Sequence, residues 1–458
     1  MTEKELKRSV LTVTTFASFL TPFMGSSVNL ALPAIGSEFG LNAMTLNWVV
    51  SSYMLSTAMF LLPAGRLGDI LGRKKVFSAG IYLFTLTLLL LSFTPGIEFL
   101  ISLRIIQGIA SAMVFGTNMA ILTAVFPAGE RGRAMGINVT SVYVGLASGP
   151  FLGGILTRYL GWRSIFAVLI PMGLISIYLI NSKIKEEWRD SHGEKFDLKG
   201  AVICGLSLAS VMYGFSRLPG ISGWIITTLG IILMILFFII ENRVEFPVFD
   251  VSLLHKNRVF AFSSLAALIH YAATSAIGFF LSLYLQYIKG MGPRDSGFVL
   301  MSWPLLMAVL SPLAGKLSDK LNPGRMASAG MAITATGLLL LCTVSENTPL
   351  IYIISMLVLI GAGFGLFSSP NSNAIMSSVE RKQLGNASGM TGTVRMVGQT
   401  MSMGIAMMLI AIFMGKEKVT PENNLQFMAA MKTGFIVFSA LCIIGVFASL
   451  QRNKDLTR

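Results

Sequence analysis

Two acidic residues of this chain lie inside similar glycine-rich and basic segments. Asp69 belongs to PAGRLGDILGRKKV at 63–76, and Asp319 belongs to LAGKLSDKLNPGRM at 313–326. A carboxylate in such a setting can accept hydrogen bonds from the N-terminus of a neighbouring helix, or pair with an arginine such as Arg73. The residue types therefore predict a releasable latch rather than a catalytic group.

The glycines of the first segment fit the same interpretation. Gly65 and Gly72 allow close backbone approach and positive φ angles that other residues resist. The alternative is that the basic residues of the segment only anchor a loop at the membrane surface. Asp69 favours the latch, because a negative charge within the basic turn offsets the positive charge that a loop needs if it only sets membrane topology.

Two further residue types could move or hold a proton within apolar sequence. Arg104 lies in an apolar run, where a charge costs about 3 kcal/mol and needs a partner or water. Gln107 is three residues further on and shares its helix face. His270 lies near the middle of another run and has a pKa range suited to proton transfer. For both Arg104 and His270, a structural role in packing or hydrogen bonding is the alternative.

Other polar residues at mid-run depth are candidates for lining a substrate cavity. They are Asn29, Asn118, Tyr143, Tyr271, Trp303, Asn371, Asn373, Arg395 and Gln399. No HExxH, GxSxG or GxxxxGK[ST] pattern occurs, and the three cysteines are isolated within apolar runs. We therefore expect no enzyme activity, no cofactor and no metal site.

Composition shows which elements must position these residues. The chain has 458 residues, of which 54% are hydrophobic and 12% charged, against about 25% charged in soluble domains. A helix needs about 20 apolar residues to cross a bilayer, and such runs recur along the whole chain. The formal charge of +14 gathers in alternate loops, which predicts membrane topology with both termini cytoplasmic rather than nucleic-acid binding.

The apolar runs predict an all-α polytopic membrane protein with fourteen transmembrane helices. The first run is too long and lacks the small-residue pattern of a cleaved signal peptide. The predicted spans are approximately 10–33, 46–64, 76–94, 99–123, 134–157, 163–182, 199–216, 223–241, 259–287, 296–314, 326–343, 350–369, 386–414 and 431–450.

Internal repeats divide these spans into two sets. GIASAMVFG at 108–116 parallels GAGFGLFSS at 361–369, and GRAMG at 132–136 parallels GNASG at 385–389. Such repeats typify transporters with a substrate site between the halves. We expect an N-terminal six-helix bundle over 1–185, a pseudo-symmetric C-terminal bundle over 259–458, and a cytoplasmic linker with an inserted two-helix hairpin over 186–258.

The chain resembles the major facilitator superfamily along its whole length, and within it the fourteen-helix drug:proton antiporter branch that includes multidrug and tetracycline exporters. The motifs behind the resemblance are the loop segment around Asp69, the RxxQG pattern at 104–108, VNLALP at 28–33 and GLASGPFLGG at 145–154. The resemblance implies that Asp69, Arg73 and Asp319 form an inner gate. It also implies that Arg104 takes part in proton coupling.

The segment 145–154 resembles the antiporter motif of such exporters. Its small and kinking residues are Gly145, Gly149, Pro150, Gly153 and Gly154. Small residues four apart allow close helix contacts, and proline bends a helix. The resemblance implies a seal between the two bundles, and ordinary helix packing is the equally supported alternative.

One position departs from the family pattern. Many relatives place an aspartate four residues before the valine of VNLALP, where this chain has Met24, and no Asp or Glu lies well inside a predicted span. His270 and the span-edge residue Glu98 are the substitutes for a proton carrier. Because a buried dication needs a carboxylate, the cavity should favour neutral or anionic amphiphiles, or a monocation held by aromatic faces.

The expected function is therefore secondary active export of amphiphilic small molecules by alternating access, in exchange for protons. The expected setting is the plasma membrane, with lipids as neighbours and a monomer as the working unit. A proton-independent facilitator or metabolite exporter is the first alternative. A sensor or receptor that keeps the fold without moving solute is the second.

Overall fold

A computed structural model describes residues 2–40, 43–189, 193–415 and 423–452. The described residues form helices joined by turns, with no strand among them. Twelve of these helical segments are long and apolar enough to cross a membrane, or thirteen if the two bent parts of the helix from Ala128 to Leu160 count as one span. The N-terminal helix does not add to that number, so the predicted count of fourteen is not confirmed.

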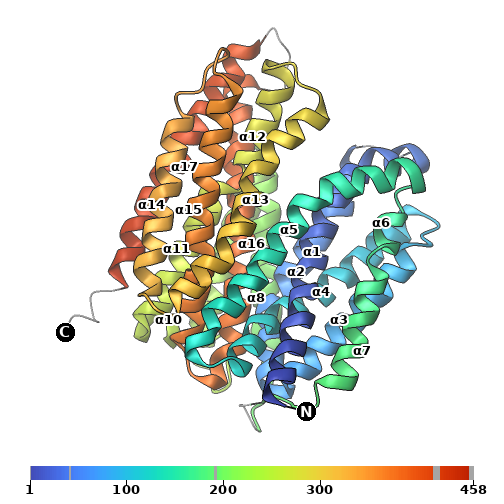
Figure 1. The fold of residues 1–458 in the computed structure, drawn as a ribbon, viewed down its shortest axis with the longest axis vertical. Coiled ribbons are helices and arrows are strands. Elements are labelled where there is room, and N and C mark those ends of the chain that lie inside the picture. Colours follow the sequence, from blue (N-terminus) through green and yellow to red (C-terminus); the bar gives the residue numbers. More distant parts are fainter. Residues whose placement is uncertain (1, 41–42, 190–192, 416–422, 453–458) are drawn as a thin grey trace.

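The first group of helices comes from the N-terminal part of the chain (Figure 1). It comprises α1 (Glu3–Phe39), α2 (Ala43–Leu71), α3 (Arg73–Leu91), α4 (Ile97–Val125), α5 (Ala128–Leu160), α6 (Ser164–Ala167) and α7 (Ile170–Lys183). Helix α1 begins with a capping box, in which the Thr2 hydroxyl accepts the Glu5 N–H and the Glu5 carboxylate accepts the Thr2 N–H. Helix α5 bends by 44° between Gly149 and Phe151, as a proline at 150 predicts.

The second group comes from the C-terminal part of the chain. It comprises α10 (Ser252–Lys256), α11 (Arg258–Thr274), α12 (Ile277–Leu283), the π-helical turn η1 (Tyr284–Ile288), α13 (Pro293–Ser318), α14 (Pro323–Leu341), α15 (Leu350–Ser377), the 3₁₀ turn η2 (Arg381–Gln383), α16 (Leu384–Met414) and α17 (Asn424–Gln451). A large apolar cluster fills this group and includes the rings of Phe280, Phe435 and Phe438, with Phe280 packed against the other two.

The two groups meet mainly where α5 packs against α13 and where α16 packs against α2 and α4, and α15 also contacts α5. The beginning of α1 and the end of α17 lie at the same end of the molecule, which we call the termini end (Figure 1). The ribbons of the two groups are close at this end and diverge towards the other. The contacts that join the groups must therefore be sought at the termini end.

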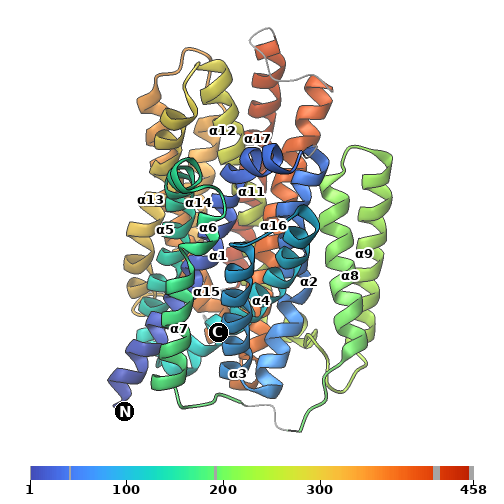
Figure 2. The same ribbon diagram turned by 90° about the vertical axis from the view of Figure 1, so that its right-hand side faces the viewer.

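A helical hairpin formed by α8 (Leu198–Ser216) and α9 (Ile221–Glu241) stands at one side of the molecule (Figure 2). Helix α8 packs against both α2 and α16 and so covers the junction of the two groups on that side. Phe215 of α8 lies against Gly404 of α16, and Tyr213 stacks on Trp48 of α2 at a centroid distance of 5.9 Å. Apolar side chains of α9, such as Ile225 and Ile232, are more than half exposed, as expected for a surface facing lipid.

Candidate functional site: two latches and an aromatic cluster between the helix groups

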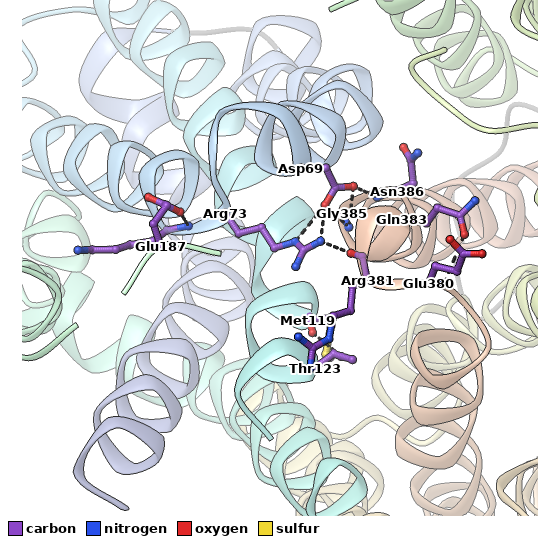
Figure 3. A network of polar contacts seen from close by, with 11 residues as sticks. Asp69, Arg73, Met119, Thr123, Glu187, Glu380, Arg381, Gln383, Gly385 and Asn386 are labelled. Carbon is purple, nitrogen blue, oxygen red and sulfur yellow. Dashed lines mark hydrogen bonds and ion pairs between the residues drawn. The ribbon is translucent and has the colours of Figure 1, made fainter. Parts of the chain in front are cut away.

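Asp69 joins the two helix groups at the termini end. It lies in the last turn of α2 and is fully buried. Its carboxylate accepts N–H groups of Gly385 at 3.0 Å and of Asn386 at 3.2 Å, in the first turn of α16. It also accepts hydrogen bonds from Nε and Nη2 of Arg73, at 3.0 and 2.8 Å. Figure 3 shows the carboxylate between the guanidinium and the start of α16.

The start of α16 is built to receive this carboxylate. Residues at a helix N-terminus leave N–H groups without an intrahelical acceptor, and the helix dipole favours a negative charge there. Gly385 is required because a methyl group in its place would lie 2.1 Å from the Gly65 carbonyl oxygen and 2.6 Å from Asp69 Oδ2. Arg73 also donates to the Arg381 carbonyl oxygen, just before the helix. We call this set of contacts the first latch.

A second latch repeats the arrangement with the groups exchanged. Asp319, after the last turn of α13, accepts the N–H groups of Gly132 at 2.7 Å and of Arg133 at 3.0 Å, within the first two turns of α5. A methyl group at Gly132 would lie 2.2 Å from the carbonyl oxygen of Gly315. The predicted gate residues Asp69 and Asp319 are thus each brought to a helix of the opposite group.

The partners in these latches are the repeated segments of the sequence. GRAMG at 132–136 and GNASG at 385–389 are matched segments, and each receives the aspartate of the other half's loop segment. The sequence revealed the repeats, but it could not show that they cross between the halves, because spatial neighbours are not visible in a displacement along the chain.

The segment after α7 binds back onto the loop segment of the first latch. Gly72 has φ of 116°, a backbone region that favours glycine, and it introduces α3. The Glu187 carboxylate accepts the Lys74 N–H at 2.9 Å, and the Trp188 carbonyl oxygen accepts the Arg73 N–H at 3.0 Å. This carboxylate satisfies a helix N-terminus in the way that Asp69 satisfies α16. Sequence reasoning missed it, because Glu187 lies in an ordinary charged stretch.

Arg104 is fully buried between α4 and α2. Its Nε donates to the Val49 carbonyl oxygen at 3.0 Å, its Nη1 donates to Gln107 Oε1 at 2.6 Å, and its guanidinium carbon lies 4.3 Å from the centre of the Tyr53 ring. Nη2 has no acceptor among the described residues. The predicted Arg104–Gln107 pair is therefore formed, with one guanidinium nitrogen left for a water molecule or ligand.

Three of the predicted cavity residues gather around Phe364 of α15. Tyr143 comes from α5, Tyr271 from α11 and Trp303 from α13, with ring centroids 5.8, 5.6 and 6.1 Å from Phe364. The Tyr143 hydroxyl donates to Ser368 Oγ at 3.1 Å, across the two helix groups. Trp303 Nε1 is buried without an acceptor among the described residues. This aromatic cluster joins both groups and presents an unused hydrogen-bond donor.

Asn118 and Asn371 take part in buried networks inside each group. Asn118 Nδ2 donates to Ser18 Oγ at 2.8 Å and to Asn138 Oδ1 at 3.2 Å. Asn371 accepts Nη1 of Arg452 at 2.7 Å and donates to the Ser263 carbonyl oxygen at 3.1 Å. These two asparagines occupy matched positions of the repeats and hold helices together.

Arg452 was missed by sequence reasoning. It lies directly after the last apolar run, which is typical of a topological charge, yet it is fully buried. It also donates to Ser263 Oγ and to the Gly324 carbonyl oxygen. Only the packing of α14 and α17 reveals the site, so nothing in the residue pattern could have found it.

The remaining predicted residues have varied surroundings. Asn373 Nδ2 donates to Ser318 Oγ at 3.1 Å, beside the second latch. Arg395 is half-buried, with its guanidinium carbon 4.8 Å from the centre of the Phe115 ring. Asn29, Gln399 and Glu98 are exposed.

His270 is fully buried among rings. Its centroid lies 4.6 Å from that of Phe364 and 4.1 Å from that of Phe367, and Nδ1 is 3.9 Å from Cys442 Sγ. Nε2 has no partner among the described residues. The ring therefore adjoins the aromatic cluster and keeps one nitrogen available.

The segment 145–154 packs α5 onto α1 of the same group. Methyl groups at Gly145, Gly149 and Gly153 would approach Phe19, Ser26 and Ser27 within 3 Å. Ser27 Oγ donates to the Gly149 carbonyl oxygen at 3.0 Å. Gly154 is half-buried, and the side chain of Pro150 lies outside the described part. The close neighbours of these three glycines belong to one helix group.

Comparison with known proteins gives three kinds of match. The family model described as Major Facilitator Superfamily matches residues 14–403. The riboflavin transporter RibZ of Clostridioides difficile is 28% identical over 450 residues, covering 97% of this chain and 98% of RibZ. The cephamycin export protein CmcT of Amycolatopsis lactamdurans is 31% identical, covering 86% and 82%. The multidrug resistance protein Stp of Mycobacterium tuberculosis is 30% identical, covering 84% and 73%.

A solved structure shares the fold. The human organic anion transporter MFSD10 matches with a TM-score of 0.69 at 14% sequence identity, covering 98% of this chain and 100% of that one. At this identity the match supports the helix arrangement alone.

Proposed function

The chain belongs to the major facilitator superfamily, and from this premise we propose that it exports amphiphilic small molecules by alternating access. It is a multi-pass membrane protein of a transporter family. The proposal places the termini end in the cytoplasm and the molecule in the plasma membrane as a monomer. The gradient that drives export is taken to be that of protons.

The observation that carries this proposal is the pair of reciprocal latches. Asp69 and Asp319 each bind backbone N–H groups of the opposite helix group. Such bonds are worth about 1.5–3 kcal/mol each when one partner is charged, and water can replace them when the groups separate. An interface held this way favours two discrete arrangements, one closed and one open at the termini end, as rocking of two repeats requires.

Residues at several separate places in the two helix groups support a neutral or anionic substrate. Met24 is fully buried, at the position where the family resemblance leads us to expect an acid. Arg104 and Arg395 supply positive charge, while Trp303 Nε1 offers a donor beside stacked rings. The similarity to a protein named as a riboflavin transporter and to one named as a cephamycin export protein is consistent with a small-molecule substrate.

Proton exchange is the finer part of the proposal, with Arg104, Gln107, His270 and Glu98 as candidate participants. The alternative is a proton-independent facilitator or metabolite exporter. Two observations favour this alternative, namely the absence of an acid at position 24 and the similarity to a riboflavin transporter over nearly the whole chain.

Purified protein in liposomes tests both versions. An internal pH dye follows protons while neutral, anionic and cationic amphiphiles are added under an imposed pH gradient, and solute movement is measured in parallel. Substrate-dependent proton movement with neutral or anionic compounds supports the exchanger. Solute movement without protons supports the facilitator, and preference for dications contradicts the inferred charge class.

The variant His270→Ala should bind substrate but lose the pH dependence of transport. An unchanged pH dependence in this variant removes His270 from the mechanism.

A further inference from the structure

A buried acid lies outside the aromatic cluster and the latches. Among the described residues, Asp69 and Glu241 are the two acids that are buried. Asp69 has Arg73 beside it. Glu241 ends α9 at 2% exposure, and no basic side chain pairs with it in the described part of the chain. A buried carboxylate without a positive partner is strongly unfavourable as an anion.

Glu241 faces another carboxylate at the base of the hairpin. Asp197 is the N-cap of α8, where its Oδ1 accepts the Gly200 N–H at 3.0 Å. Glu241 Oε2 accepts the Phe249 N–H at 3.0 Å. Each acid thus uses one oxygen for a backbone N–H group. The other oxygens, Asp197 Oδ2 and Glu241 Oε1, are buried and have no donor in the described structure.

The two unused oxygens converge on one point above Gly200. A methyl group built on Gly200 would lie 1.9 Å from Glu241 Oε1 and 2.6 Å from Asp197 Oδ2. Two carboxylates that share a site repel each other when both are ionised, and a single proton between them removes the repulsion and supplies the missing donor. We propose that Asp197 and Glu241 together bind one proton at the base of the inserted hairpin.

The site connects three segments of the chain. Asp197 begins α8, Glu241 ends α9, and Phe249 belongs to the segment that leads to α10 and the second helix group. Among the described residues of α8, Cys204 also lies within electrostatic range of Glu241. Arg66 of α2, against which α8 packs, is paired with Glu194. The bound proton therefore ties both ends of the hairpin to the connection between the helix groups, and its loss places two negative charges together.

The test is thermal unfolding of the full-length protein between about pH 5.5 and about pH 7, above the usual range of carboxyl titration. The native state holds a proton that the unfolded chain releases, so stability should fall as pH rises. Relative to Glu241→Gln, the wild-type midpoint should fall by roughly 1–2 °C per pH unit. The glutamine variant should lose this dependence, because its amide can donate to Asp197 Oδ2 without a proton.

Two further variants keep the test decisive. Glu245→Gln removes an exposed acid four residues away and should keep the wild-type pH profile. Asp197→Asn retains a good N-cap residue and should flatten the profile as Glu241→Gln does, which covers the case that Glu241→Gln does not fold. Parallel profiles for wild type and both site variants would overturn the proposal. So would a wild-type profile that shifts on addition of a chelator, because a metal cation would then be the ligand.

Discussion

Replacing Asp69 with asparagine tests the first latch directly. The side chain keeps its shape but loses its charge, so the bonds from the Gly385 and Asn386 N–H groups become neutral ones. Charged hydrogen bonds exceed neutral ones by about 1 kcal/mol each. The closed arrangement at the termini end should therefore lose about 2 kcal/mol relative to the open one, which corresponds to a shift of about 30-fold in their ratio.

A cysteine placed at Ser388 reports this shift. Ser388 is 1% exposed and donates to the Phe115 carbonyl oxygen across the two helix groups, one turn beyond Gly385. In a background that lacks the three native cysteines, a polar thiol reagent should label Ser388→Cys about 30-fold faster when Asp69→Asn is also present.

The control for this experiment is Glu245→Gln, which removes an exposed acid outside the latch and should leave the labelling rate of Ser388→Cys unchanged. A second check is the thermal midpoint, which must show that the Asp69→Asn protein is folded. Equal labelling rates with aspartate and asparagine at position 69, in folded protein, would refute the claim that these bonds hold the closed arrangement.

Three further results are expected. Gly385→Ala should destabilise the closed arrangement by about 1–3 kcal/mol through overpacking and so reduce transport, whereas Gly25→Ala, with open space around it, should leave transport rates unchanged. Trp303→Phe removes the unpartnered Nε1 donor and should weaken substrate binding by about 1 kcal/mol, or about fivefold, in a binding assay. Hydrogen bonds from Arg163 hold the pKa of Glu38 below its usual value of 4.5. The carboxylate therefore stabilises the folded state above that pH, and this stabilisation is lost on acidification. The difference in thermal midpoint between wild type and Glu38→Gln should shrink as the pH is lowered.

Parts of this architecture could be predicted from the sequence because they depend on local chemistry. Apolar runs predict helices directly, and an aspartate within a glycine-rich basic turn predicts a partner such as a helix N-terminus. Arg104 and Gln107 were correctly paired because residues three apart share a helix face. The bend in α5 follows from the loss of a backbone donor at a proline.

Other parts depended on which surfaces meet, which the sequence does not state. Glu241 lies at the edge of an apolar run, like many exposed charges, yet the chain after α9 folds over it and Asp197 faces it. The helix count also exceeded what the described structure supports, because α1 begins with charged residues and is less uniformly apolar than the other long helices.

In the two latches, each repeat binds a segment of the other repeat, and this crosswise pairing has a consequence for the symmetry of the molecule. The loop segment of the first half (63–76) binds the glycine-rich segment of the second half (385–389), and the loop segment of the second half (313–326) binds the glycine-rich segment of the first (132–136). Such reciprocal contacts are the pattern of an isologous interface in a two-fold dimer. A half-length chain carrying one loop segment and one glycine segment could therefore pair with a copy of itself through both latches at once. The hairpin breaks this equivalence, because α8 covers the α2–α16 junction and a two-fold dimer would require the same cover on the α5–α13 side.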